Sequence, residues 1–152
     1  MKIVKSAVLA AGLALAVAGT SYAALDAAAM IKTRQDGMKG QGGALKGIGQ
    51  GLGGGASAAD LKVLSAKLVA SSAQVGGWFP KGSGPESGVK THAKSEIWSD
   101  AAGFKAARDN FAAQAAKLDA AAASGDVEAI KAQFGPTRMA CKGCHDKYKA
   151  ED

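Results

Sequence analysis

The chain has 152 residues and a formal net charge of +6 at pH 7, with few aromatic residues and abundant alanine and glycine. A chain of this size forms one domain that is large enough to bury a core. The positive charge is modest and contains no run of five like charges, so the composition gives no indication of nucleic-acid binding.

The first residues predict an export signal. Lys2 and Lys5 precede an apolar run over residues 7–19, and Ser21-Tyr22-Ala23 offers a cleavage site of small residues. The run is too short and too rich in alanine for a membrane span, which needs roughly 20 apolar residues. We expect residues 1–23 to be a cleaved signal peptide and residues 24–152 to be the mature domain. An uncleaved anchor is the alternative.

A first helix is predicted from about Leu25 to about Leu52. Arg34 and Gln35 lie one turn before Met38, on the same side of this helix. Glycines recur between positions 37 and 51, and each costs up to about 1 kcal/mol relative to alanine. Packing must therefore hold the helix, and glycine also lets a flat molecule or another backbone come close. The apolar face consists of Ile31, Met38, Leu45, Ile48 and Leu52.

A second helix and a long loop follow. Ser57 and Asp60 resemble a capping box, which predicts a helix start at that point. Residues 76–92 are rich in glycine, proline and serine and predict a long loop, of the kind that is usually functional or mobile. Trp78 and Phe79 stand at its start, where we expect them to fasten it to the core. The inward face of the second helix consists of Leu61, Leu64, Leu68, Ser72 and Val75.

Two further helices complete the chain. A third is predicted from about Lys94 to Ala123, and Asp126 is a suitable N-cap for a fourth. Pro136 is expected to interrupt and kink the fourth helix, because it removes a backbone hydrogen bond. The inward faces are Ile97, Ala101, Phe104, Phe111, Ala115 and Leu118, and then Val127, Ile130, Phe134, Cys141, Cys144, His145 and Tyr148. Without strand-like alternation, this pattern predicts an all-α, antiparallel four-helix bundle.

The fourth helix carries Cys141-Lys142-Gly143-Cys144-His145, the attachment signature of c-type haem. In such a motif the thiols add to the haem vinyl groups and the imidazole binds the iron. Spacings of three and four residues place Cys141, Cys144 and His145 on one side of a helix. No methionine follows His145, so any sixth iron ligand comes from earlier in the chain.

Three other readings of the motif are weaker. A thioredoxin-type site needs strand–helix alternation around the cysteines, which the sequence does not show. A structural zinc site needs four ligands, and His92 is the only other histidine. We expect His92 to be exposed in the loop, without a ligand role. A plain disulfide leaves His145 without a purpose.

Several segments together resemble the cytochromes c′, which are class II c-type cytochromes of bacterial periplasms. The resemblance covers the whole mature chain in order, through Arg34-Gln35, Phe79-Pro80-Lys81-Gly82-Ser83, Glu96-Ile97-Trp98 and the segment 141–148. It implies a four-helix bundle, one covalently bound haem c near the C-terminus and a homodimer packed through the first two helices. It also implies five-coordinate, high-spin iron behind an apolar residue.

By position, the resemblance implies that Arg34 and Gln35 contact the haem propionates. Guanidinium groups pair well with carboxylates, and a solvated charge is the alternative for Arg34. Met38 would lie over the iron as a shield or, as in some low-spin relatives, as the sixth ligand. Phe79 would pack against the macrocycle or simply anchor the loop, and Trp98 is expected in the core.

The expected function is that of a periplasmic haem protein that binds nitric oxide or carbon monoxide, transfers single electrons, or does both. A low-spin electron-transfer cytochrome with Met38 bound to iron is the alternative. We do not expect an enzyme, because no general base is visible beside the ligand position. Lys142, Lys147 and Lys149 flank the motif as a solvated face that would steer an acidic redox partner.

Overall fold

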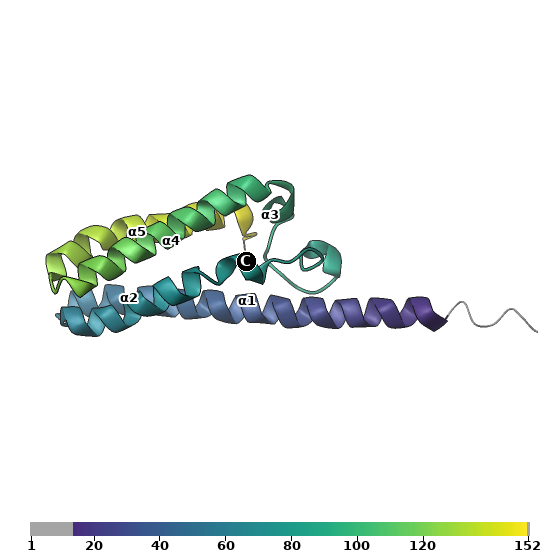
Figure 1. The fold of residues 1–152 in the computed structure, drawn as a ribbon, viewed down its shortest axis with the longest axis horizontal. Helices are drawn as coiled ribbons and strands as arrows, with labels where there is room; N and C mark the ends of the chain where they lie inside the picture. The colour runs from purple at the N-terminus through teal and green to yellow at the C-terminus, as the bar shows by residue number, and fades with distance from the viewer. Residues whose placement is uncertain (1–13, 152) are drawn as a thin grey trace, which may run out of the picture.

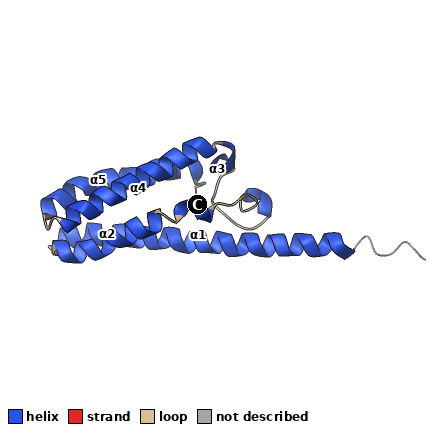
Figure 2. Ribbon diagram, viewed as in Figure 1, coloured by secondary structure: helices blue, strands red, loops and turns tan. Residues whose placement is uncertain are grey.

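The computed structural model describes residues 14–151, and describes side chains from Asp26 onward. Helices account for most of this part of the chain, and loops join them (Figure 2). The long helices are α1 (Ala14–Gly54), α2 (Ala58–Ser72), α4 (Ala101–Ala123) and α5 (Val127–Tyr148). Shorter elements are α3 (Glu96–Ser99) and the 3-10 helices η1 (Val75–Trp78) and η2 (Pro85–Ser87). The predicted all-α, antiparallel four-helix bundle is confirmed (Figure 1).

The helix starts predicted at Ser57 and Asp126 are confirmed. The Ser57 hydroxyl accepts a hydrogen bond from the Asp60 N–H, and the Asp60 carboxylate accepts one from the Ser57 N–H. The Asp126 carboxylate accepts from the N–H groups of Glu128 and Ala129. Each cap satisfies donors that the first turn of a helix leaves without a partner.

The predicted third helix is wrong as a single element, because Asp100 divides it into α3 and α4. Asp100 has φ −114° and ψ 56°, and its carboxylate accepts a hydrogen bond from the Gly103 N–H to cap α4. Ala101, the first residue after the break, is exposed rather than directed inward as predicted. A strong N-cap residue therefore outweighed the continuous apolar spacing.

The predicted interruption at Pro136 is also wrong, since α5 runs through it without a break. The neighbouring Thr137 is fully buried, and its hydroxyl donates toward the carbonyl oxygens of Gln133 at 2.9 Å and Gln114 at 3.3 Å. This contact ties α5 to α4 beside the proline. The helix therefore continues although proline cannot make the usual backbone hydrogen bond at this position.

Helix α1 begins earlier than predicted, at Ala14 rather than near Leu25. Alanine, the best helix former, is abundant over this stretch. Residues 1–13 of the predicted signal peptide lie outside the described residues, so its cleavage stays a prediction. Within residues 14–151, no helix combines the length and apolar character needed to cross a bilayer.

The bundle is closed along three of its four sides. Helix α4 packs against α2 and α5, and α1 packs against α2. Helices α1 and α5 meet at Gly49, where a Cβ would lie 2.8 Å from a ring carbon of Phe134. Gly37 similarly receives Trp78, whose nearest ring carbon would lie 2.3 Å from a Cβ. These glycines admit aromatic side chains to the surface of α1, which explains their place in a helix.

Candidate haem site

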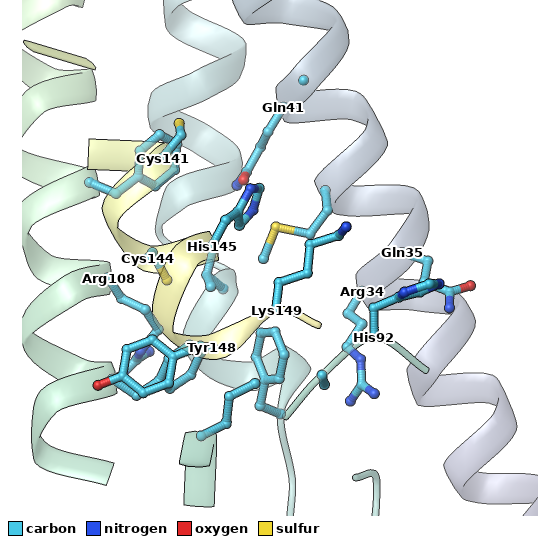
Figure 3. A pocket seen from close by; sticks show the side chains of 18 of the residues that line it. Arg34, Gln35, Gln41, His92, Arg108, Cys141, Cys144, His145, Tyr148 and Lys149 are labelled. Carbon is cyan, nitrogen blue, oxygen red and sulfur yellow. The ribbon is translucent and has the colours of Figure 1, made fainter. Parts of the chain in front are cut away.

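A cavity of about 640 Å³ lies between α1 and the C-terminal half of α5. Helix α1 forms one wall, while α4 and α5 form the facing side (Figure 3). The loop between η1 and α3 closes one end of the cavity with Phe79, Thr91 and His92. Its lining is mainly apolar with a few convergent polar groups, which is typical of a cofactor or ligand site.

Helix α5 contributes the partly buried Cys141 and Cys144 to this cavity, together with His145, which is more exposed than the predicted inward face implies. Burial, together with the neighbouring Cys144, raises the pKa of the Cys141 thiol to about 11, and burial also raises the pKa of Cys144. Burial and the nearby Lys149 lower the pKa of His145. At neutral pH the site therefore presents two thiols and a neutral imidazole, the form in which histidine binds metals.

Arg34 reaches the cavity from α1 and is only 3% exposed, so it is not a solvated charge. Its guanidinium donates to the hydroxyls of Ser83 at 2.9 Å and Thr91 at 2.6 Å, and lies 5.1 Å from the ring centre of Phe79. Burial lowers its pKa, and Glu86 opposes that shift. Arg34 thus joins α1 to the long loop and places a cation at the loop end of the cavity.

Gln35 and Met38 are partly buried and line the same wall of α1. Phe79 lines the loop end and packs edge-on against Phe104, with ring centres 5.0 Å apart. The Trp98 indole donates to the backbone oxygens of Phe79 and Pro80 at 3.2 Å. Phe79 is therefore both a loop anchor and part of the cavity wall.

The expectation of an exposed His92 is wrong, since this residue is partly buried and lines the cavity. The Ala150 N–H donates to the His92 carbonyl at 2.8 Å, and Ala93 forms an isolated β-bridge with Lys149. These backbone contacts draw the loop against the end of α5. The loop's glycine-rich composition concealed them.

The lysines beside the motif form less of a positive face than predicted. Lys142 pairs with Asp146 at 2.5 Å, and Lys147 pairs with Asp100 at 2.5 Å. Lys149 instead lines the cavity beside His145. Two of the three charges are thus offset locally, which weakens long-range steering of an acidic partner.

Sequence reasoning missed two polar residues of the cavity, Gln41 and Arg108. Each has a buried nitrogen without a hydrogen-bond partner, Nε2 of Gln41 and Nε of Arg108. Gln41 lies three residues beyond Met38 on the inward face of α1, so helical spacing provided the signal for it. Arg108 lies four residues beyond Phe104, and its guanidinium carbon is 5.3 Å from that ring centre.

The alternative sites find no support in the described part of the chain. Among the residues whose side chains the structure describes, no group of three His, Cys, Asp or Glu is placed to hold a metal ion. Residues 14–151 contain no β-strand beside the cysteines, as a thioredoxin-type site requires. The cavity and the motif therefore point to a flat cofactor held along α5.

The sequence pattern of the cytochrome c′ family matches residues 29–149. The chain belongs to the cytochrome c′ family. A relative from Rubrivivax gelatinosus is 60% identical over 68 residues, which cover 45% of this chain and 53% of that protein. The chain thus matches about half the length of that relative. The cytochrome c′ of Allochromatium vinosum is 33% identical over 155 residues, which cover 99% of this chain and all of that protein.

Solved structures of the family have the same fold. A cytochrome c′ described as having ligand-controlled dimer dissociation superposes with a TM-score of 0.77 at 30% identity, covering 82% of this chain and 97% of that one. A nitric oxide complex of a variant from Alcaligenes xylosoxidans superposes with a TM-score of 0.72 at 32% identity, covering 80% and 94%.

Proposed function

We propose that the chain is a periplasmic c-type haem protein that binds diatomic gases at a coordination position facing α1. One observation carries this proposal. The cavity places Cys141, Cys144 and His145 on its α5 wall and Met38 on its α1 wall. The chain offers two thiols for covalent attachment and one imidazole for the iron. It places no second histidine on α1 for the opposite position.

The residues fit a single haem c. An apolar cavity of about 640 Å³ suits a flat macrocycle, and two cysteines and a histidine at spacings of three and four match its attachment points. When bound, the haem supplies an iron centre that takes up gas ligands and carries one electron. Arg34 and Gln35 would neutralise and orient the propionates, and Phe79 would pack against the ring.

Met38 controls access in this proposal. It lines the α1 wall and is partly buried, so an incoming ligand must displace a flexible apolar side chain. That requirement disfavours bulky molecules and admits small ones. The nitric oxide complex of the similar Alcaligenes xylosoxidans protein supports gas binding, with nitric oxide and carbon monoxide as the ligands we propose here.

The ferrous protein, purified after export, tests this proposal by absorption and resonance Raman spectroscopy. We expect a five-coordinate, high-spin spectrum that changes when nitric oxide or carbon monoxide is added. Met38→Ala should leave it five-coordinate and speed gas binding. Met139→Ala is the matched control, since Met139 is 64% exposed on α5 and should affect neither property.

A six-coordinate, low-spin spectrum without added ligand would overturn the open position. If Met38→Ala then converted that spectrum to high spin, the chain would be an electron-transfer cytochrome with Met38 as its sixth ligand. We propose a binding and electron-carrying role rather than an enzymatic one. The Arg34 guanidinium is engaged by Ser83, Thr91 and Phe79, which leaves it poorly placed for acid–base work.

We further propose that the mature protein is a homodimer packed through α1 and α2. The outer face of α2 exposes small and apolar side chains, Ala59, Val63, Ala66 and Ala70. Sedimentation should give twice the mature mass, and Val63→Glu should shift it toward the monomer. Amino-terminal sequencing of periplasmic material should begin at Ala24 if the signal peptide is cleaved as predicted.

A further inference from the structure

The side-chain amide of Gln41 is buried with a donor that has no hydrogen-bond partner. The residue is only 8% exposed, and the atom without a partner is Nε2. A buried donor left unsatisfied is costly, and such groups are uncommon in native structures. Figure 3 shows that the side chain extends from α1 into the cavity, on the side facing α5. The missing partner is therefore a group that enters the cavity.

The position of Gln41 along α1 indicates which part of a bound molecule would be its hydrogen-bond partner. Gln41 lies one turn beyond Met38 and seven residues beyond Arg34, which at 1.5 Å per residue is about 10 Å along the helix. The Arg34 cation marks the loop end of the cavity, where acidic groups of a cofactor would lie. Gln41 instead shares the wall of Met38, across the cavity from His145. Its amide therefore lies near the proposed ligand position, and not at the loop end where the acidic groups of a cofactor would lie.

We propose that the Gln41 side-chain amide donates a hydrogen bond to the molecule bound opposite His145. The pocket then favours ligands whose outer atom accepts a hydrogen bond, either small anions or diatomics that draw negative charge from the iron. This inference rests on the proposed gas-binding function and adds a specificity-determining residue to it.

The physical basis is a buried donor that lies between apolar neighbours along α1. Met38 and Leu45, one turn before and one turn after Gln41, offer no donor to a ligand. An amide N–H in such surroundings gains a partner only when an acceptor arrives, so the gain differs between ligands. Ligands without acceptor character leave the amide unsatisfied.

Arg108 also lines the cavity with a buried nitrogen that has no hydrogen-bond partner, but it lies on a different wall from Gln41. It comes from α4 and lies over the Phe104 ring, and its charge opposes the rise that burial causes in the pKa of Cys144 on α5. It therefore belongs to the wall that carries the attachment motif. Among the side chains that the structure describes, two buried nitrogens lack partners, and of these the nitrogen of Gln41 lies on the Met38 wall.

The haem-loaded protein tests this inference through the variant Gln41→Leu, which keeps the approximate shape and removes the amide. Fluoride bound to the ferric protein is a pure hydrogen-bond acceptor. We expect its affinity to fall roughly threefold to tenfold in the variant, the size of one neutral hydrogen bond. In the ferrous carbon monoxide complex, the C–O stretching frequency should rise, because a donor near the ligand favours charge transfer onto it.

Gln50→Leu is the matched control, since Gln50 is exposed on the same helix and does not line this cavity. It should change neither value. If Gln41→Leu fails to fold, the wild-type fluoride complex still decides, because its iron–fluoride vibration should shift in deuterated water.

Unchanged fluoride affinity and C–O frequency in Gln41→Leu, or no deuterium shift in the wild type, would overturn the role of Gln41 and leave gas binding intact. A chain that carries no haem would instead remove the proposed function itself.

Discussion

The two ends of the bundle are built from the same four helices but are filled in different ways. At the end that carries the α1–α2 and α4–α5 connections, apolar side chains form the larger of the two buried clusters. At the other end α1 and α5 enclose a cavity, and a loop with buried polar contacts closes it. The closed end has a core that includes Ile48, Leu61, Leu118 and Ile130, whereas the cavity end has a small cluster of Ile97, Phe104 and Tyr148.

This difference indicates that the closed end mainly stabilises the fold, whereas the cavity end mainly provides the binding site. The closed end buries most of the apolar side chains and maintains the helix spacing. The cavity end gives up part of that packing and gains space for a cofactor. Substitutions in the two ends should therefore have different signatures, on unfolding in one case and on the haem spectrum in the other.

The largest effect on stability is expected in the closed end. Leu118→Ala removes a fully buried side chain and should lower the free energy of unfolding by about 2–5 kcal/mol. Denaturant unfolding of the haem-loaded protein measures this, and the spectrum of the folded variant should be unchanged. Met139→Ala, at a position 64% exposed, is the control and should cost at most about 0.5 kcal/mol. A loss below 1 kcal/mol for Leu118→Ala would contradict the assigned core.

A smaller loss of unfolding free energy is expected when the contacts of Arg34 at the cavity end are removed. Arg34→Ala removes the hydrogen bonds to Ser83 and Thr91 and should lower the free energy of unfolding by about 2 kcal/mol. The loop of residues 79–91 should become more sensitive to proteolysis, and the haem spectrum should change. Arg138→Ala, at an exposed position on α5, should do neither. Equal unfolding free energies and equal protease sensitivity of the two variants would contradict the proposal that Arg34 joins α1 to the loop.

The sequence predicted the closed end better than the cavity end, because the rules that govern each differ. Apolar spacing and the caps at Ser57 and Asp126 are local signals, and they located the helices. The break at Asp100 was also a local capping signal, but it was hidden within a continuous apolar pattern. At the cavity end the important contacts join distant segments, as Arg34 joins α1 to the loop.

The motif itself identified Cys141, Cys144 and His145, because covalent haem attachment requires those residue types at that spacing. Gln41 and His92 were not recognised as lining residues. Polar residues on an inward helix face are usually solvated or paired, and only the fold shows that Nε2 of Gln41 is neither. The position of His92 depends on backbone contacts with the end of α5, which no local pattern encodes.

The helix cap at the closed end should have a moderate effect. Ser57→Ala removes the side-chain acceptor for the Asp60 N–H and should cost about 1 kcal/mol of unfolding free energy. Ser95→Ala is a matched control, because Ser95 precedes α3 but its side chain makes no capping hydrogen bond. Thermal unfolding of both variants should show a lower midpoint for Ser57→Ala alone, and equal midpoints would refute the cap.

The smallest effect is expected at Asp100, beside the cavity end, and it depends on pH. Hydrogen bonds from Lys147, Tyr148 and the Gly103 N–H lower the pKa of this carboxyl to about 2. The pKa of a free aspartate is about 4. The free energy that ionised Asp100 contributes to the folded state is therefore complete above about pH 4 and is lost as the pH falls toward 2.

Asp100→Asn should therefore be less stable than the wild type at neutral pH, and the two proteins should converge near pH 2. Unfolding measured across this range tests the prediction. Asp109→Asn, in an exposed pair with Lys105, is the control and should show little difference at any pH. A gap between Asp100→Asn and the wild type that persisted at pH 2 would exclude carboxylate ionisation as its cause.

Intact mass spectrometry of the protein purified after export tests the central claim most directly. The account predicts a polypeptide that carries the mass of one haem through denaturation, with the added mass on the peptide that contains Cys141 and Cys144. A bare polypeptide with both thiols free after authentic maturation would contradict it.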